Sequence, residues 1–109
     1  MAEVKVEMRE ELSQSLARLL DLLRSKGGLR ISEAYLYGSR ASGAASMDSD
    51  IDVAVVSPDL TGDRVQDWYR LNKLAKEIDV RIEVVGFRPE LFRDEHPLAW
   101  EVRKGKRLA

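Results

Sequence analysis

The sequence contains no cysteine, only three prolines and a single histidine among its 109 residues. The absence of cysteine excludes disulfide bonds, a thiolate nucleophile and every cysteine-ligated zinc or iron–sulfur site. The one histidine, His96, precedes Pro97 and has no acidic residue at a useful spacing, so it is predicted to be a turn residue and not a catalytic base. The chemistry of this chain must come from carboxylates, hydroxyls and cations.

Long hydrophobic runs and a charge excess of one sign are also missing. No apolar run approaches the ~20 residues of a membrane-spanning helix, and residues 1–5 lack the apolar core of a signal peptide. Eighteen Lys and Arg balance 19 Asp and Glu, which excludes the global positive field of a dedicated nucleic-acid or anionic-membrane binder. We therefore expect a cytoplasmic protein in which any site for a polyanion is local.

The residues that are present predict one folded domain spanning residues 1–109. Hydrophobic residues make up 44% of the chain and charged residues 34%, without a repeat or a linker. The spacing of apolar residues predicts helices over 4–26 and 62–78, strands over 31–37, 51–56 and 80–87, and one or two short helices from residue 89. This alternation predicts a single α/β domain.

Carboxylates in two of the predicted strands form the most informative pattern. Asp50 and Asp52 are two residues apart, so both side chains leave the same face of a strand and can converge on a hard divalent cation. Glu83 could supply a third carboxylate if its strand lies next to theirs. Three acids can hold two Mg²⁺ ions, the arrangement that serves in-line displacement at phosphorus. The pattern therefore points to a phosphorylated substrate.

A glycine-containing turn before these acids suits the phosphates of such a substrate. Gly38 lets the backbone approach an anion closely, and Ser39 offers a hydroxyl and an N–H. Arg40 adds a bidentate phosphate donor. We predict that these three residues bind phosphate groups of a nucleotide.

Simpler interpretations exist for the same residues. Asp50 and Asp52 could be a solvated strand end, and Glu83 could merely pair with Arg81 across a strand face. Asp48 is more typical of a turn or a helix cap than of a metal ligand. The combination of the glycine turn with three acids favours the metal–nucleotide interpretation.

These residues resemble a known signature. Tyr37-Gly38-Ser39-Arg40 together with Ser49-Asp50-Ile51-Asp52-Val53 is similar to the motif of the DNA polymerase β-like nucleotidyltransferase superfamily, and the short chain resembles its minimal nucleotidyltransferase (MNT) branch. The resemblance implies a small mixed β-sheet flanked by helices and transfer of a nucleoside monophosphate from a nucleoside triphosphate to a hydroxyl. It implies that Gly38 and Ser39 hold the triphosphate, that Asp50 and Asp52 bind Mg²⁺, and that Glu83 is the third ligand.

The resemblance also implies a partner. Many prokaryotic members of this branch are encoded beside a helical protein of the HEPN class and act as its antitoxin, in some cases by adding adenylyl groups to it. We therefore expect ATP or another nucleoside triphosphate as substrate, two Mg²⁺ ions, and a HEPN-type partner. RNA remains open as an acceptor and a second copy of the chain as a partner. The alternative is a binding module that acts by complex formation and does not catalyse.

Three further groups of residues have two interpretations each. Trp68 and Tyr69 lie on the apolar stripe of the second predicted helix, which favours packing in the core or against a partner over base stacking. Basic residues near the C-terminus are a solvated tail or a contact for RNA or an acidic partner: Arg103, Lys104, Lys106 and Arg107. Apolar residues of the same region would suit an interface if they are not all core: Leu91, Phe92, Leu98, Trp100 and Val102.

Overall fold

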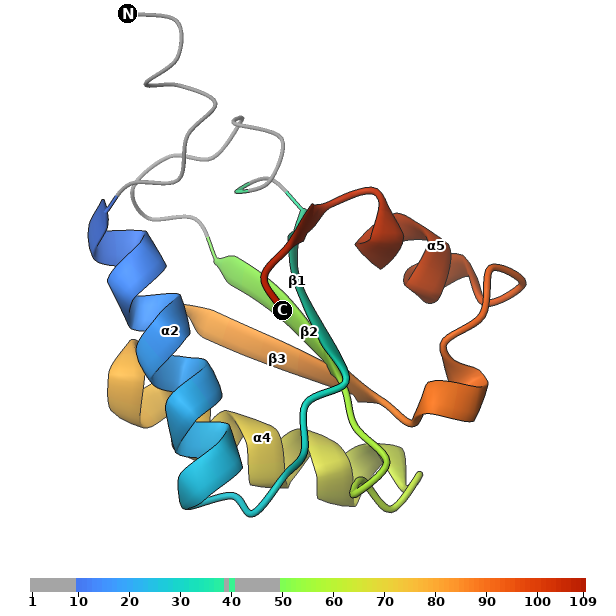
Figure 1. The fold of residues 1–109 in the computed structure, drawn as a ribbon, viewed down its shortest axis with the longest axis horizontal. Coiled ribbons are helices and arrows are strands. Elements are labelled where there is room, and N and C mark those ends of the chain that lie inside the picture. The colour runs from blue at the N-terminus through green and yellow to red at the C-terminus, as the bar shows by residue number, and fades with distance from the viewer. Residues whose placement is uncertain (1–9, 39, 41–49) are drawn as a thin grey trace, which may run out of the picture.

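The computed structural model describes residues 10–38, 40 and 50–109, whose arrangement is shown in Figure 1. In chain order the elements are α2 (Glu10–Ser25), β1 (Glu33–Tyr37), β2 (Ile51–Val56), α4 (Arg64–Ile78), β3 (Ile82–Phe87), the 3-10 helix η1 (Pro89–Leu91), α5 (Pro97–Arg103) and β4 (Lys106–Arg107). The strands form one sheet in the order β3-β2-β1-β4, with β2 and β3 parallel and the other neighbours antiparallel. The prediction of a small mixed sheet flanked by helices is confirmed.

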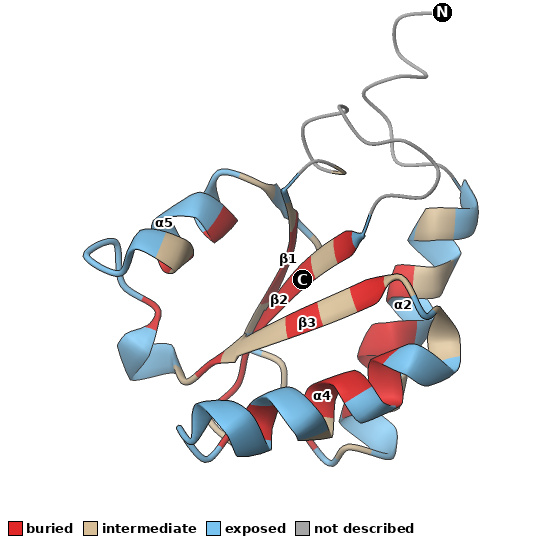
Figure 2. Ribbon diagram, turned by 180° about the vertical axis from the view of Figure 1, so that it is seen from behind, coloured by how far each residue is buried: buried red, intermediate tan, exposed pale blue. Residues whose placement is uncertain are grey.

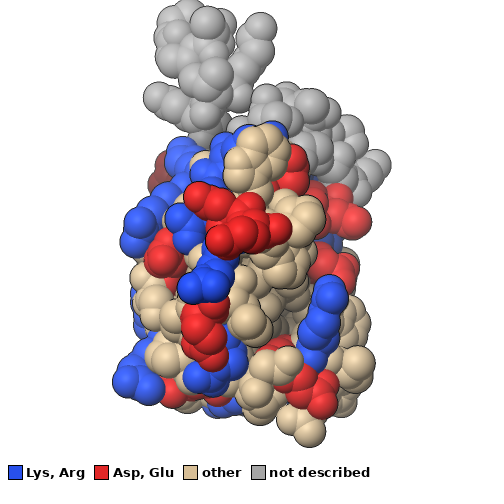
Figure 3. Space-filling view, turned by 90° about the vertical axis from the view of Figure 1, so that its right-hand side faces the viewer, with Lys and Arg blue, Asp and Glu red and all other residues tan. Residues whose placement is uncertain are grey.

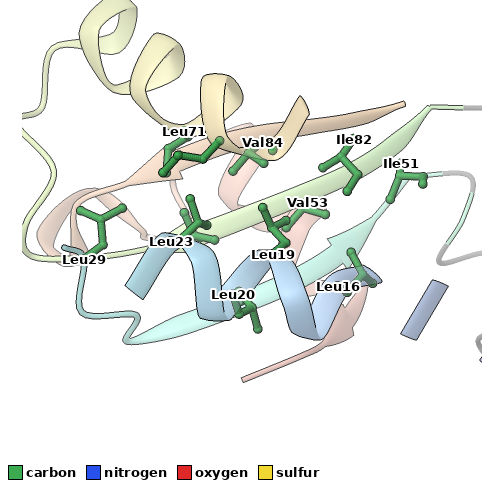
Figure 4. Close-up of a cluster of buried hydrophobic side chains, with 14 of the residues drawn as sticks. Leu16, Leu19, Leu20, Leu23, Leu29, Ile51, Val53, Leu71, Ile82 and Val84 are labelled. Atoms are coloured by element: carbon green, nitrogen blue, oxygen red, sulfur yellow. The ribbon is translucent and has the colours of Figure 1, made fainter. Parts of the chain in front are cut away.

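Helices cover the two faces of the sheet unequally. The helices α2 and α4 pack on one face and α5 on the other (Figure 1). The strand β2 serves both layers, because successive side chains of a strand point to opposite faces. Ile51, Val53 and Val55 join the leucines of α2 in the larger core, which Figure 4 shows. Ala54 and Val56 face α5.

The predicted element boundaries hold for β2 and move by a few residues elsewhere. The helix α4 begins one residue after Asp63, whose carboxylate accepts hydrogen bonds from the N–H groups of Val65 and Gln66 and so caps the helix. The predicted strand over 80–87 begins only at Ile82, and Val80 is 76% exposed. The first part of the predicted helix over 4–26 lies outside the described residues. Figure 2 colours the ribbon of these elements by how far each residue is buried.

Asp79 explains why β3 starts late. Its carboxylate accepts hydrogen bonds from the backbone N–H of Arg81 at 2.8 Å and from the Arg81 guanidinium at 3.0 and 2.7 Å, which closes a turn between α4 and β3. These contacts hold the pKa of Asp79 at about 2. Arg81 therefore pairs with Asp79 in this turn, and it precedes the strand that carries Glu83.

Side chains of α4 form hydrogen bonds with the backbone N–H and carbonyl groups along the free edge of β3. The buried Asn72 donates from Nδ2 to the carbonyls of Trp68 and Val84, both at 2.8 Å, and accepts from the Val84 N–H at 2.7 Å. One turn later, the Lys76 ammonium donates to the Ile82 carbonyl. Edge strands expose backbone groups that need partners, and here the neighbouring helix supplies them. The position of β3, and with it Glu83, depends on this contact.

We expect Asn72→Ala to destabilise the fold by about 3 kcal/mol, because it leaves a buried N–H and a buried carbonyl of β3 without partners. Urea unfolding measures the effect. Lys73→Ala, at the adjacent exposed position, is the matched control and is expected to stay within about 0.5 kcal/mol of the wild type. Equal midpoints for the two variants would contradict the role given to Asn72.

The C-terminal elements only partly follow the sequence prediction. The predicted short helices are η1 and α5, and His96 caps α5 by accepting a hydrogen bond at Nδ1 from the Leu98 N–H. Phe92 and Val102 are buried in the smaller core, between α5 and the sheet, whereas Leu91 and Trp100 are about half exposed. The short strand β4 was not predicted. It pairs with β1 over two residues.

Basic residues near the C-terminus form hydrogen bonds and ion pairs within the domain. The Arg103 guanidinium donates to the Phe92 carbonyl at 2.8 Å, and Lys104 pairs with Glu101 at 3.1 Å. Figure 3 shows basic and acidic side chains interspersed on the side of the molecule that carries α5. Of the alternatives for these residues, this distribution favours a solvated surface over an RNA contact. No helix in the described part of the chain is long and apolar enough to cross a membrane.

An exposed ion pair ties the segment before β1 to the turn after β2. The Asp59 carboxylate accepts from the Arg30 N–H at 2.8 Å and from its guanidinium at 3.1 and 2.9 Å. These hydrogen bonds lower the pKa of Asp59 from 3.8 to about 2.

We expect the Arg30–Asp59 pair to make part of the stability dependent on pH. The pKa of Asp59 is lower in the folded protein than in the unfolded chain, so its contribution is complete above about pH 4 and is lost as the pH falls toward about 2. Urea midpoints across this range measure the loss. Asp59→Asn should flatten this part of the profile, and an unchanged slope in the variant would contradict the assignment.

Candidate active site

Three strands bring the predicted residues to one end of the sheet. Because β1 is antiparallel to β2, the end of β1 lies beside the start of β2, and the parallel β3 starts there too. In this register Tyr37 is opposite Asp52, and Asp52 is opposite Glu83. Strand alternation puts all three side chains on the face that carries α5. The strands of Asp52 and Glu83 are therefore adjacent, which was the condition for predicting Glu83 as the third acid.

Gly38 lies directly against one of these carboxylates. Its φ angle is +75°, a left-handed conformation that favours glycine. A Cβ atom added at this position would lie 2.6 Å from Oδ2 of Asp52, closer than real Cβ contacts. The glycine is thus required twice, by its backbone conformation and by the space that the Asp52 side chain occupies.

The electrostatics of Asp52 indicate a concentration of negative charge. Partial burial raises the pKa of the Asp52 carboxyl, and the nearby charges of Asp50 and Glu83 raise it further. Asp50 itself is exposed, whereas Asp52 and Glu83 are half-buried. A bound cation would relieve this repulsion, and carboxylate oxygens are the ligands that Mg²⁺ prefers.

Two aromatic residues lie at the acidic cluster, Tyr37 opposite Asp52 in the register and Trp68 in contact with Glu83, and the sequence analysis gave neither a role there. Burial, together with the charges of Asp52 and Glu83, raises the pKa of Tyr37 to about 12, so its phenol stays protonated at neutral pH. The indole Nε1–H of Trp68 donates to Oε2 of Glu83 at 2.9 Å. Of the two packing alternatives predicted for Trp68 and Tyr69, the core is wrong, because they are 47% and 62% exposed, and packing against a partner stays a prediction. Tyr37 could have been suspected, because it directly precedes Gly38.

Of the remaining predicted residues, the structure describes only Arg40. Ser39 and Asp48 lie outside the described residues. Arg40 is half-buried, and its charge contributes to lowering the pKa of Asp79 in the turn before β3. Over the described ranges, no three acidic or histidine side chains already converge as a metal site. The residue types, the shared face and the mutual repulsion of the acids nevertheless fit a cation that draws these carboxylates together.

A pocket of about 360 Å³ lies between the start of α4, the C-terminal half of β3 and the start of α5. Its wall is mainly apolar and includes Trp68, Val85, Phe87 and Leu98. The acidic cluster lies toward the other end of β3, and Trp68 connects the two. Trp68 therefore belongs to both features: its ring lines the pocket and its nitrogen contacts Glu83.

The structure thus combines a mixed sheet with acids beside a glycine turn, and comparison with known proteins identifies the family. Residues 16–104 match the model of the nucleotidyltransferase domain. The chain belongs to this family, which confirms the family predicted from residues 37–53.

Comparison also finds similar individual proteins and solved structures. The protein adenylyltransferase MntA of Shewanella oneidensis is 39% identical over 54 residues, which are 50% of this chain and 38% of MntA. A structure from Sulfolobus solfataricus, described as a nucleotidyltransferase candidate, covers 89% of this chain and 86% of its own at 18% identity, with a TM-score of 0.57, and supports the fold. A crystal structure of a toxin-antitoxin with AMP-PNP has 29% identity and a TM-score of 0.48, covering 68% of this chain and 56% of its own. The chain spans well under half the length of MntA.

Proposed function

We propose that this domain transfers a nucleoside monophosphate, in the first place AMP from ATP, to a hydroxyl group of a protein or RNA acceptor. The observation that carries the proposal is the row of Asp52 and Glu83 on adjacent strands, with Gly38 against the Asp52 carboxylate. The name of the relative MntA, a protein adenylyltransferase, favours ATP as donor and a protein as acceptor.

Asp50, Asp52 and Glu83 would together hold two Mg²⁺ ions. Asp50 and Asp52 would bind the ion that accompanies the triphosphate, and Asp52 and Glu83 the second. Such ions neutralise charge on the phosphates and lower the pKa of the acceptor hydroxyl. The raised pKa of Asp52 supports this role, because the clustered charges favour a cation among them.

The chain's own residues would bind and orient the reactants. Gly38, Ser39 and Arg40 would hold the β- and γ-phosphates through backbone N–H groups, a hydroxyl and a guanidinium. A bond forms between the acceptor oxygen and the α-phosphorus while the bond from that phosphorus to the β-phosphate oxygen breaks, which releases pyrophosphate. The hydroxyl proton would pass to Glu83, the best candidate general base, or to solvent.

We further propose that a partner protein, of the helical HEPN type, completes the site as toxin to this antitoxin. Exposed apolar side chains border the pocket that is connected to Glu83 through the Trp68 hydrogen bond: Val65, Trp68 and Leu91. Such side chains favour burial against another protein. The same surface favours the alternative function, a binding module that neutralises its partner by complex formation without catalysis.

Incubation with Mg²⁺ and each α-labelled nucleoside triphosphate tests the proposal, with and without the product of the neighbouring gene. Label on the partner or on RNA, from ATP more than from the other nucleotides, is the expected result. A stable complex that acquires no label from any nucleotide would favour the binding module instead.

A further inference from the structure

The side chain of Trp68 has one polar atom, Nε1, and this atom contacts Glu83, the acid whose role is least defined by the sequence. The Nε1–H donates to Oε2 of Glu83 at 2.9 Å, a normal length for a charge-assisted hydrogen bond. The ring is 47% exposed, so burial in the core does not account for its placement. The contact with Glu83 is the specific interaction of this side chain.

The backbone on both sides of this hydrogen bond is held by a single residue. Asn72 donates to the carbonyl of Trp68 and to the carbonyl of Val84, the neighbour of Glu83 in β3, and it also accepts from the Val84 N–H. The helix that carries the donor and the strand that carries the acceptor are therefore fixed to each other. A site residue supported in this way keeps one orientation.

We infer that Trp68 is a positioning residue, which fixes the Glu83 carboxylate at the edge of the acidic cluster so that it acts together with Asp52. The inference rests on the proposed function. An ionised carboxylate has about four lone-pair positions and the indole uses one, so the hydrogen bond is compatible with binding a cation or accepting a proton. Residues that hold metal ligands in this way affect activity about 10- to 100-fold.

The indole resonances of the two tryptophans test the contact without relying on turnover. In ¹H–¹⁵N spectra, the Trp68 Nε1–H signal is expected to shift in Glu83→Gln and to respond to Mg²⁺ with a non-hydrolysable ATP analogue. Trp100, exposed on α5 beside Lys104, is the internal control and should not move. A Trp68 signal that is unchanged by both the substitution and the ligands would overturn the inference.

Activity provides the second readout. Trp68→Phe keeps the ring and removes the donor, and it should lower kcat about tenfold with little change in the KM for nucleotide. Trp68→Phe combined with Glu83→Gln should be no worse than Glu83→Gln alone, because Trp68 acts through Glu83. Trp100→Phe is the matched control and should match the wild type. Independent, additive losses would overturn the inference.

The two proposals fail in distinguishable ways. If the wild type transfers nucleotide and Trp68→Phe is equally active, the positioning role is wrong and the proposed function stands. If the wild type transfers nothing under any condition, the proposed function fails. The indole response to Mg²⁺ with the analogue then still decides whether Trp68 and Glu83 act as one unit at a cation site.

Discussion

Asp52→Asn is expected to reduce nucleotidyl transfer about a thousandfold or more while the fold remains intact. Asp52 lies between Tyr37 on the neighbouring strand β1 and Glu83 on the neighbouring strand β3. It is the acid that both proposed metal positions share. Its loss would remove charge stabilisation of about 4 kcal/mol in the transition state, which corresponds to that factor. Initial rates with α-labelled ATP measure it.

Stability should change in the opposite direction to activity. The pKa of Asp52 is raised in the folded protein by burial and by Asp50 and Glu83, so the ionised side chain destabilises the fold at neutral pH and this penalty disappears as the pH falls. Asparagine removes the charge, and the variant should unfold at the same or a higher urea concentration than the wild type. A variant that retains activity, or one that loses activity only because it unfolds, would contradict the assignment.

Gly38→Ala is expected to lower activity about 100-fold. The added Cβ would lie 2.6 Å from Oδ2 of Asp52, so the carboxylate or the turn must move, and a displacement of about 1 Å at a reacting site can cost this factor. The positive φ of +75° adds a strain of about 1–2 kcal/mol to the folded state. Transfer rates and urea unfolding separate the two effects.

Gly28→Ala is the matched control for this variant. Gly28 has a φ of +68°, and a Cβ there meets no atom within 4 Å. The control should therefore share the loss of stability but keep the transfer rate of the wild type. Equal activity losses in both variants would show that backbone strain, and not the contact with Asp52, is responsible.

The sequence predicted the elements and the candidate acids because these follow from local patterns. The apolar run in β2 is typical of a strand buried on both faces, and the spacing of Asp50 and Asp52 places both carboxylates on one face. Strand pairing is not local, so the register that sets Glu83 beside Asp52 could only be stated as a condition. The late start of β3 depends on the Asp79–Arg81 turn, which a run of β-branched residues concealed.

The contact of Trp68 with the acidic cluster also could not be predicted, and the reason is different. Trp68 falls on an apolar stripe, and the stripe predicts burial. Its actual contact joins α4 to β3 across the sheet edge, and it depends on Asn72 fixing those two elements together. The sequence signal for such a tertiary contact was an asparagine in the middle of a predicted helix, a position that asparagine does not favour.

The central claim is that the acidic row and the glycine turn transfer the nucleotidyl group and release pyrophosphate. The most direct test counts, in one reaction with ATP, Mg²⁺ and the partner protein, the labelled acceptor and the pyrophosphate formed. Equal amounts of both, lost together in Asp52→Asn, are the predicted result. Release of ADP or orthophosphate in place of pyrophosphate, or label that persists in Asp52→Asn, would contradict the account.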